Sequence, residues 1–159
     1  MLAFYGIKMK PIIATNLTGL FIKTAPWKQA HKLWFEKVMR ETGDKFLKKW
    51  ANRADYFKGV DIAMKELMPN STDKQRTKKA REIYMESVLA HVRKNKNKVV
   101  NKKVINFFGK LKSKYRLALV TTNTKSFVDK ITRTAGIRNL FDIIESSKPA
   151  EKDDKVAVF

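Results

Sequence analysis

Short runs rich in apolar residues occur at three places in the chain; each run predicts a β-strand, and the first is expected to be buried. The runs lie at residues 12–14, 117–120 and 141–145. Between them, apolar residues recur three or four positions apart, which is the spacing of one helix face. The predicted helix faces are Ala30, Leu33, Trp34 and Val38; Val60, Ala63, Met64 and Leu67; Ala80, Tyr84, Val88 and His91; Val104, Phe107, Phe108 and Leu111; and Val128 and Ile131.

Capping and helix-breaking residues predict where several of these helices begin and end. Thr24 is the predicted N-cap of the first helix, with Pro26 in its first turn, and Gly43 is its predicted end. Gly136 ends the last helix in the same way. The polar run "RKNKNK" at residues 93–98 predicts a solvated loop or hinge.

The order of these elements predicts an α/β fold with a parallel sheet. Strands that alternate with helices favour parallel pairing, because parallel neighbours need a crossover connection. The helical block at residues 26–98 is too long for a simple crossover, so we interpret it as an inserted α-helical cap. The α/β core would comprise residues 9–25 and 99–159, and Met9 is an alternative start that makes residues 1–8 an N-terminal extension.

The net charge is the most unusual feature of the composition. The 159 residues include 35 Lys and Arg against 15 Asp and Glu, which gives a formal charge of +20. Such a field attracts polyanions, so a basic nucleic-acid-binding protein is one hypothesis. However, the lysines are scattered through every segment, which favours an ordinary enzyme with a Lys-rich surface.

Other compositional features exclude several classes of protein. The chain has no cysteine, which excludes disulfides, thiolate catalysis and cysteine-based metal sites. No apolar run is long enough to span a bilayer, so no membrane association is predicted. The first residues lack the order of a signal peptide, and we expect a cytoplasmic protein.

Polar residues follow each predicted strand. Asn16 and Thr18 follow the first strand, and Thr121, Thr122 and Asn123 follow the second. Three lysines follow the third strand: Lys148, Lys152 and Lys155. In a parallel sheet, ligands bind beyond the carboxyl ends of the strands. Hydroxyl, ammonium and backbone N–H groups gathered there predict a site for an anion such as phosphate.

The stretch after the first strand resembles the first motif of the haloacid dehalogenase superfamily of phosphatases. Members typically carry "FDLDGxLxDTxP", and "TNLTGLFIKTAP" follows the same register without a gap. The resemblance implies that Asn16 occupies the position of the nucleophilic aspartate and Thr18 that of the general acid/base. Gly19 keeps the turn glycine, and Lys23 replaces the acid near the cap hinge.

Two later stretches are similar to the second and third motifs of the same superfamily. "LALVTTNT" is a strand that ends in the hydroxyl residue Thr121, and "ESSKPAEKDD" resembles the motif whose lysine holds the phosphoryl group. Lys148 is the predicted lysine, with Lys152 and Lys155 as alternatives. The resemblance implies an incomplete Rossmann-like parallel sheet with an inserted helical cap. It also implies phosphoryl transfer through an aspartyl nucleophile, a phosphorylated small molecule as ligand and Mg²⁺ as cofactor.

The departures from the motifs predict that this chemistry is lost or severely impaired. Asn16 has the shape of aspartate, but its neutral amide cannot attack phosphorus as a carboxylate does. Mg²⁺ prefers charged oxygens, so Asn16 predicts weak or absent metal binding at this degraded metal position. Thr18 is a poor general acid, because a hydroxyl does not titrate near neutral pH, although the family's ion-pump branch carries Thr there.

The family's fourth motif, an acidic strand, is absent from the sequence. Its strand normally lies beside the first strand, so we expect the strand at residues 12–14 to be an exposed sheet edge. Either a shortened or decayed gene product or a pseudoenzyme that binds ligands without turnover is consistent with this pattern. An interaction domain that self-associates through the exposed edge is a further hypothesis.

Single residues in the helical insert have simpler interpretations. His31 and His91 lack partner acids at ligand spacing, so we expect packing or surface histidines. The aromatic residues of the insert form either a pocket over the site or the core of the cap, and cap core is the expected role. These residues are Trp27, Trp34, Trp50, Phe35, Phe46 and Phe57.

Overall fold

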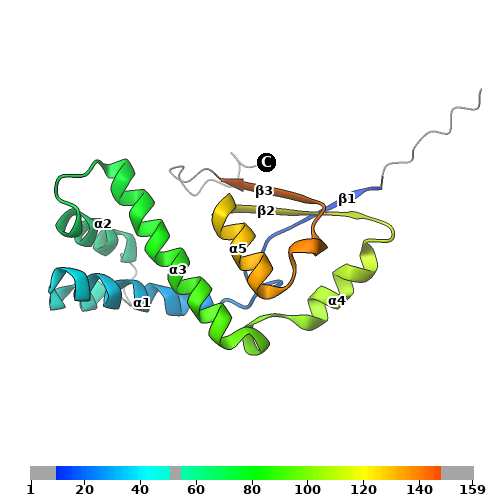
Figure 1. The fold of residues 1–159 in the computed structure, drawn as a ribbon, viewed down its shortest axis with the longest axis horizontal. Coiled ribbons are helices and arrows are strands. Elements are labelled where there is room, and N and C mark those ends of the chain that lie inside the picture. The colour runs from blue at the N-terminus through cyan, green and yellow to red at the C-terminus, as the bar shows by residue number, and fades with distance from the viewer. Residues whose placement is uncertain (1–9, 51–54, 148–159) are drawn as a thin grey trace, which may run out of the picture.

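The computed structural model describes residues 10–50 and 55–147 (Figure 1). The elements are β1 (Ile12–Thr15), α1 (Ala25–Thr42), the 3₁₀ helix η1 (Lys45–Trp50), α2 (Tyr56–Leu67), α3 (Asp73–Val99), α4 (Lys102–Leu111), β2 (Arg116–Thr124), α5 (Lys125–Ala135), the 3₁₀ helix η2 (Arg138–Leu140) and β3 (Ile143–Ser147). Helices α1 and α2 and the first part of α3 gather at one end of the molecule, and the sheet lies with α4 and α5 at the other (Figure 1).

The described strands form one parallel sheet in the order β1-β2-β3. Ile13 pairs with Leu117, and Ala118 pairs with Ile143 on the other side of β2. Leu117 and Leu119 of β2 are fully buried. The structure therefore confirms the predicted α/β fold with a parallel sheet and a helical cap.

The first strand is less buried than its apolar sequence predicts. In the part of the chain that the structure describes, β1 has a neighbour only in β2, so its other side is a sheet edge. Ile12 is 55% exposed, Ala14 is exposed and Ile13 is only partly buried. The prediction of a buried strand was wrong here, because burial depends on neighbours as well as on apolar composition.

The predicted helix ends agree with the structure at both glycines. Gly43 follows α1 with φ +77° and Gly136 follows α5 with φ +78°, a left-handed conformation that glycine adopts without a steric penalty. Pro26 lies in the first turn of α1, but the Thr24 side chain makes no capping hydrogen bond. Thr72, by contrast, forms a full capping box with Gln75 at the start of α3.

Residues 93–98 were predicted as a loop or a hinge, and the prediction of a loop was wrong. Helix α3 continues to Val99, with one non-helical residue, Asn95, at φ −120° and ψ 23°. The Asn95 side chain donates a hydrogen bond to the His91 carbonyl at 3.1 Å. The lysines of this run are exposed on the helix surface, and the non-helical Asn95 marks a kink, so the hinge alternative agrees with the structure.

Buried apolar residues form two clusters, and α3 contributes to both. The cap cluster comprises Trp34, Phe35, Val38, Leu47, Trp50, Ala63, Met64 and Ile83. The sheet cluster includes Leu117, Leu119, Phe21 and, from α3, Val88 and Val92. Because α3 packs in both clusters, it links the cap to the sheet. The predicted boundaries of cap and core, 26–98 and 9–25 with 99–159, remain a prediction.

Among the described residues, no helix has both the length and the apolar character needed to cross a membrane.

Candidate functional site

The turn after β1 is held at the base of the cap by backbone hydrogen bonds. Gly19 has φ +84°, and its N–H donates to the Ile22 carbonyl at 2.7 Å. Leu17 and Ile22 are fully buried anchors of this turn. Thr18, between these anchors, is half-buried, and Asn16, just before Leu17, is exposed. The buried apolar residues therefore fix the turn and leave its polar side chains at the carboxyl end of β1.

The end of β2 lies beside this turn, because β1 and β2 are parallel neighbours. Thr121 is buried, and its hydroxyl oxygen accepts hydrogen bonds from the Asn123 backbone N–H at 3.2 Å and side-chain amide at 2.8 Å. The Thr122 carbonyl accepts a hydrogen bond from the Arg81 guanidinium at 2.8 Å. Arg81 belongs to α3, so this bond brings a cation from the helical insert to the edge of the sheet.

A cavity of about 520 Å³ opens between this edge and the cap. Three predicted site residues line it together: Thr18, Thr122 and Asn123. Asn16 and Thr121 are not among its lining residues; Thr121 lies behind Asn123. The three candidate lysines, Lys148, Lys152 and Lys155, fall outside the described residues, so their predicted role stays a prediction.

Aromatic side chains form much of the cavity wall on the cap side. His31 stacks on Tyr56 with 4.2 Å between ring centroids, and Tyr84 lies 5.2 Å from His31. The Tyr84 hydroxyl donates to the Trp27 carbonyl at 3.4 Å. Burial lowers the pKa of His31 below its usual value, and burial, with the charge of Tyr84 as a smaller cause, raises the pKa of Tyr56. Both groups are therefore neutral near pH 7.

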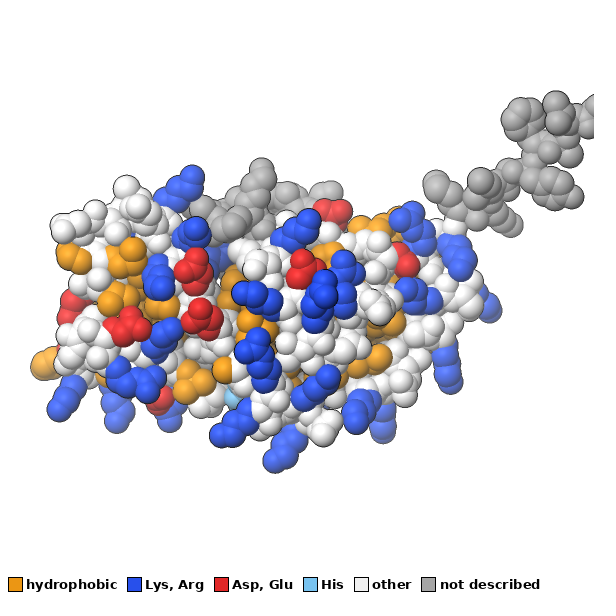
Figure 2. All heavy atoms as spheres, viewed as in Figure 1, with side chains coloured by type: hydrophobic (Ala, Val, Ile, Leu, Met, Phe, Trp, Pro, Cys, Tyr) orange, Lys and Arg blue, Asp and Glu red, His pale blue; other side chains and the backbone are white. Residues whose placement is uncertain are grey.

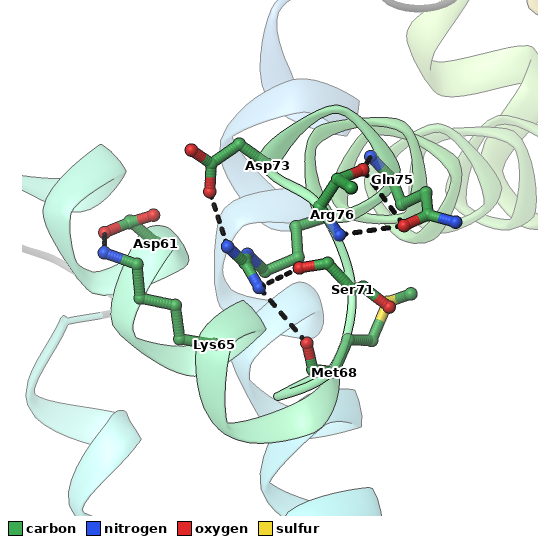
Figure 3. A network of polar contacts seen from close by, with 8 residues as sticks. Asp61, Lys65, Met68, Ser71, Asp73, Gln75 and Arg76 are labelled. Carbon is green, nitrogen blue, oxygen red and sulfur yellow. Dashed lines mark hydrogen bonds and ion pairs between the residues drawn. The ribbon is translucent and has the colours of Figure 1, made fainter.

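The far end of the cavity is polar and is organised by Arg76 (Figure 3). The Arg76 guanidinium donates to the carbonyls of Met68 and Ser71 and pairs with Asp73 at 2.5 Å. The hydrogen bond from Arg76 is the main cause of the lowered pKa of Asp73. The Nε of Arg76 is buried and has no hydrogen-bond partner within the described structure.

The donors at the sheet edge do not fit the magnesium ion that the family resemblance implies. Asn16 and Thr18 supply an amide and a hydroxyl, whereas Mg²⁺ is held in proteins chiefly by carboxylates. In residues 10–50 and 55–147, no group of three or more His, Cys, Asp or Glu residues is placed to hold a metal ion. His31 stacks on Tyr56, in agreement with the expectation of a packing histidine.

Sequence reasoning missed several residues of this site. The expectation that the aromatic residues form the cap core holds for Trp34, Phe35 and Trp50. Trp27 and Phe57, however, line the cavity. Arg76 and Arg81 were not predicted as site residues, and Tyr84 was predicted only as part of a helix face, although cavity residues recur on one face of α3 every three or four positions. This spacing could have indicated a shared helix face, but the sequence does not show which other element lies opposite that face.

Comparison with known proteins gives the same fold. The family model described as haloacid dehalogenase-like hydrolase matches residues 27–155. This match includes Thr121, Thr122 and Asn123 and begins after the turn that carries Asn16 and Thr18. Among curated proteins, none matches the chain.

Three similar solved structures show how much of such a protein the chain spans. A haloacid dehalogenase-like family hydrolase from Streptococcus pneumoniae is 19% identical with a TM-score of 0.52, over 94% of this chain and 67% of that one. CbbY from Rhodobacter sphaeroides, in complex with phosphate, is 15% identical with a TM-score of 0.56, over 87% and 64%. The hydrolase YfnB from Bacillus subtilis, bound to magnesium, is 11% identical with a TM-score of 0.50, over 87% and 66%.

This chain therefore spans about two thirds of the length of each of these structures. At such low identities the likeness shows the fold alone. The family match covers most of the sequence and includes the second motif, on a parallel sheet with a helical cap. The chain belongs to the haloacid dehalogenase-like hydrolase family.

Proposed function

We propose that this chain is a phosphatase-like member of its family that binds phosphorylated small molecules with little or no turnover. One observation carries the proposal: the turn after β1 presents Asn16 and Thr18, and not two carboxylates, next to the end of β2. The cavity between this edge and the cap supplies room for a ligand.

The chemistry of Asn16 and Thr18 supports the loss of turnover. A carboxylate attacks phosphorus because it carries a negative charge on a free oxygen, and the amide of Asn16 carries none. The hydroxyl of Thr18 neither gives up nor takes up a proton near neutral pH, so it cannot protonate a leaving group efficiently. The same proposal includes weak or absent Mg²⁺ binding and a cytoplasmic location.

Binding of a phosphate group does not require those carboxylates. Thr121, Thr122 and Asn123 offer hydroxyl and amide groups at the end of β2, and the N–H groups at the start of α5, which has no side-chain cap, favour an anion. Arg81 adds a positive charge beside Thr122. Lys148 is our candidate for a further cation. CbbY supports this proposal by analogy, since an Asp-to-Asn variant of that protein was solved with xylulose-(1,5)bisphosphate bound.

A phosphatase assay with p-nitrophenyl phosphate and Mg²⁺ tests the loss of turnover. We expect the purified chain to show no hydrolysis above background, and equilibrium titration to show binding of inorganic phosphate. Thr121→Val should weaken that binding by about tenfold, since it removes the hydroxyl that holds the backbone N–H and side chain of Asn123 at the cavity wall. Thr134→Val, a half-buried threonine of α5, is the control. Hydrolysis that a chelator abolishes would contradict the proposal.

The alternative functions rest on charge and on the sheet edge. On the face in Figure 2, Lys and Arg side chains are spread widely, with acidic side chains between them. Such scatter does not favour one nucleic-acid interface. Nucleic-acid binding and self-association through β1 therefore stay predictions, and we favour neither.

A further inference from the structure

The cavity is longer than a phosphate group needs. Its lining residues on α3 run from Asp73 at the polar end to Tyr84 near β2. This stretch of helix is about 16 Å long, since a helix rises about 1.5 Å per residue. A volume of about 520 Å³ is in the range of sites that enclose a small organic molecule. The phosphate site at the sheet edge would occupy only one end of it.

The middle of the cavity is lined by aromatic rings. The rings of His31 and Tyr56 are stacked with 4.2 Å between their centroids, and the Tyr84 ring centroid lies 5.2 Å from that of His31. Phe57 lies edge-on to Tyr56 at 5.4 Å and is 77% exposed at the rim of the cavity. An exposed aromatic ring on a cavity wall offers a face on which another planar ring can stack.

The two ends of the cavity differ in charge. The end at the sheet has Arg81, Thr122 and Asn123, which suit an anion. At the other end, the carboxylates of Asp61 and Asp73 are paired with Lys65 and Arg76, so this end carries little net charge. The two carboxylate side chains are 56% and 86% exposed and can still accept hydrogen bonds from a ligand. A ligand that fits is therefore anionic at one end, planar in the middle and rich in N–H or O–H donors at the other end.

We propose that the cavity binds a phosphate monoester that carries a planar aromatic ring, of the class of nucleoside monophosphates. This inference rests on the proposed function, because it uses the same phosphate site. Aliphatic sugar phosphates share the anionic group but have no ring that could stack on His31, Tyr56 and Phe57.

Titration of the full chain with four probes tests the inference: AMP, adenosine, glucose 6-phosphate and inorganic phosphate. We expect AMP to bind at least about tenfold more tightly than glucose 6-phosphate or phosphate, because stacking of one base on an aromatic side chain is typically worth about fivefold or more in affinity. Phosphate should compete with AMP.

Two matched variants test whether the aromatic ring of the ligand stacks on Phe57. Phe57 and Phe46 both belong to the cap and are both 77% exposed, but only Phe57 lines the cavity. Phe57→Leu should lower AMP affinity about fivefold to tenfold and leave phosphate affinity unchanged, whereas Phe46→Leu should change neither. Equal effects of the two variants on AMP would overturn the inference.

The other outcomes separate this inference from the proposed function. If glucose 6-phosphate and phosphate bind as tightly as AMP, the aromatic class is wrong and the phosphate site stands. If adenosine binds as tightly as AMP and phosphate does not compete, the phosphate site itself fails, and the proposed function fails with it.

Discussion

Asn16 is the residue at which we predict the largest departure from the chemistry of the family. It is exposed at the end of β1, on a turn whose neighbours Leu17 and Ile22 are fully buried. The fold of the turn therefore depends on apolar anchors and not on the polar side chain at position 16. A change of charge there should alter ligand binding without unfolding the turn.

Asn16→Asp should increase Mg²⁺ affinity at least about tenfold. A new negative charge within about 4 Å of a cation interacts with it by several kcal/mol at intermediate dielectric. Isothermal titration with Mg²⁺ measures the change. Asn106→Asp, an exposed asparagine of α4, adds the same charge elsewhere and should leave the affinity unchanged. Equal gains in the two variants would show that the turn after β1 is not a latent metal position.

His31 should make folding stability depend on pH. Burial lowers its pKa in the folded state, so below about pH 6.5 the unfolded chain binds more protons at this residue than the folded one. Its contribution is complete above the unfolded pKa and is lost as the pH falls toward the lowered folded value. Urea denaturation at pH 7 and pH 5 should therefore show a larger loss of unfolding free energy for the wild type than for His31→Phe. An equal loss of unfolding free energy in the two proteins would refute a contribution of His31 to the pH dependence of stability.

At the scale of elements, two glycines in helices have opposite roles. A Cβ built on Gly59 of α2 would lie 2.5 Å from the Cβ and Cγ of Trp50, while one on Gly109 of α4 meets nothing within 4 Å. Gly59 thus allows α2 to approach η1 closely in the cap core. Gly109 has no such packing reason.

We expect Gly59→Ala to destabilise the fold by about 1–3 kcal/mol, which is typical of overpacking a core. Gly109→Ala should stabilise it by up to about 1 kcal/mol, because alanine favours a helix interior over glycine. Thermal denaturation of both variants measures the two changes. If both variants gain stability, the contact between α2 and Trp50 is looser than described.

At the scale of the whole molecule, charge is the dominant property. A formal charge of +20 attracts polyanions from every side, but Lys and Arg are spread among acidic side chains on the face in Figure 2. Any RNA or DNA binding should therefore be electrostatic and uniform.

Binding to RNA and DNA oligonucleotides should weaken steeply as salt rises and should not distinguish one sequence from another. Fluorescence anisotropy at several salt concentrations measures both properties. Retention of one sequence at high salt, with loss of the others, would instead favour a dedicated nucleic-acid-binding function.

Much of the fold was predictable from local patterns. The apolar run at Leu117 and Leu119 predicted β2, and Gly43 and Gly136 predicted two helix ends, because strand burial and left-handed turns leave signals within a few residues. Predictions failed where a neighbour decides the outcome. The apolar run at Ile12 predicted burial, whereas its position at the expected sheet edge leaves it exposed, and residues 93–98 are polar but mostly helical.

The sequence by itself determined the alternation of strands and helices and the neutral side chains, Asn16 and Thr18, that follow the first strand, since both are properties of adjacent residues. Only the tertiary structure decided that Arg81 reaches the Thr122 carbonyl and that His31 stacks on Tyr56. These pairs are far apart in the chain. They meet because the apolar faces of α1, α2 and α3 bury one another against the sheet, and no local pattern specifies which polar side chains that packing brings together.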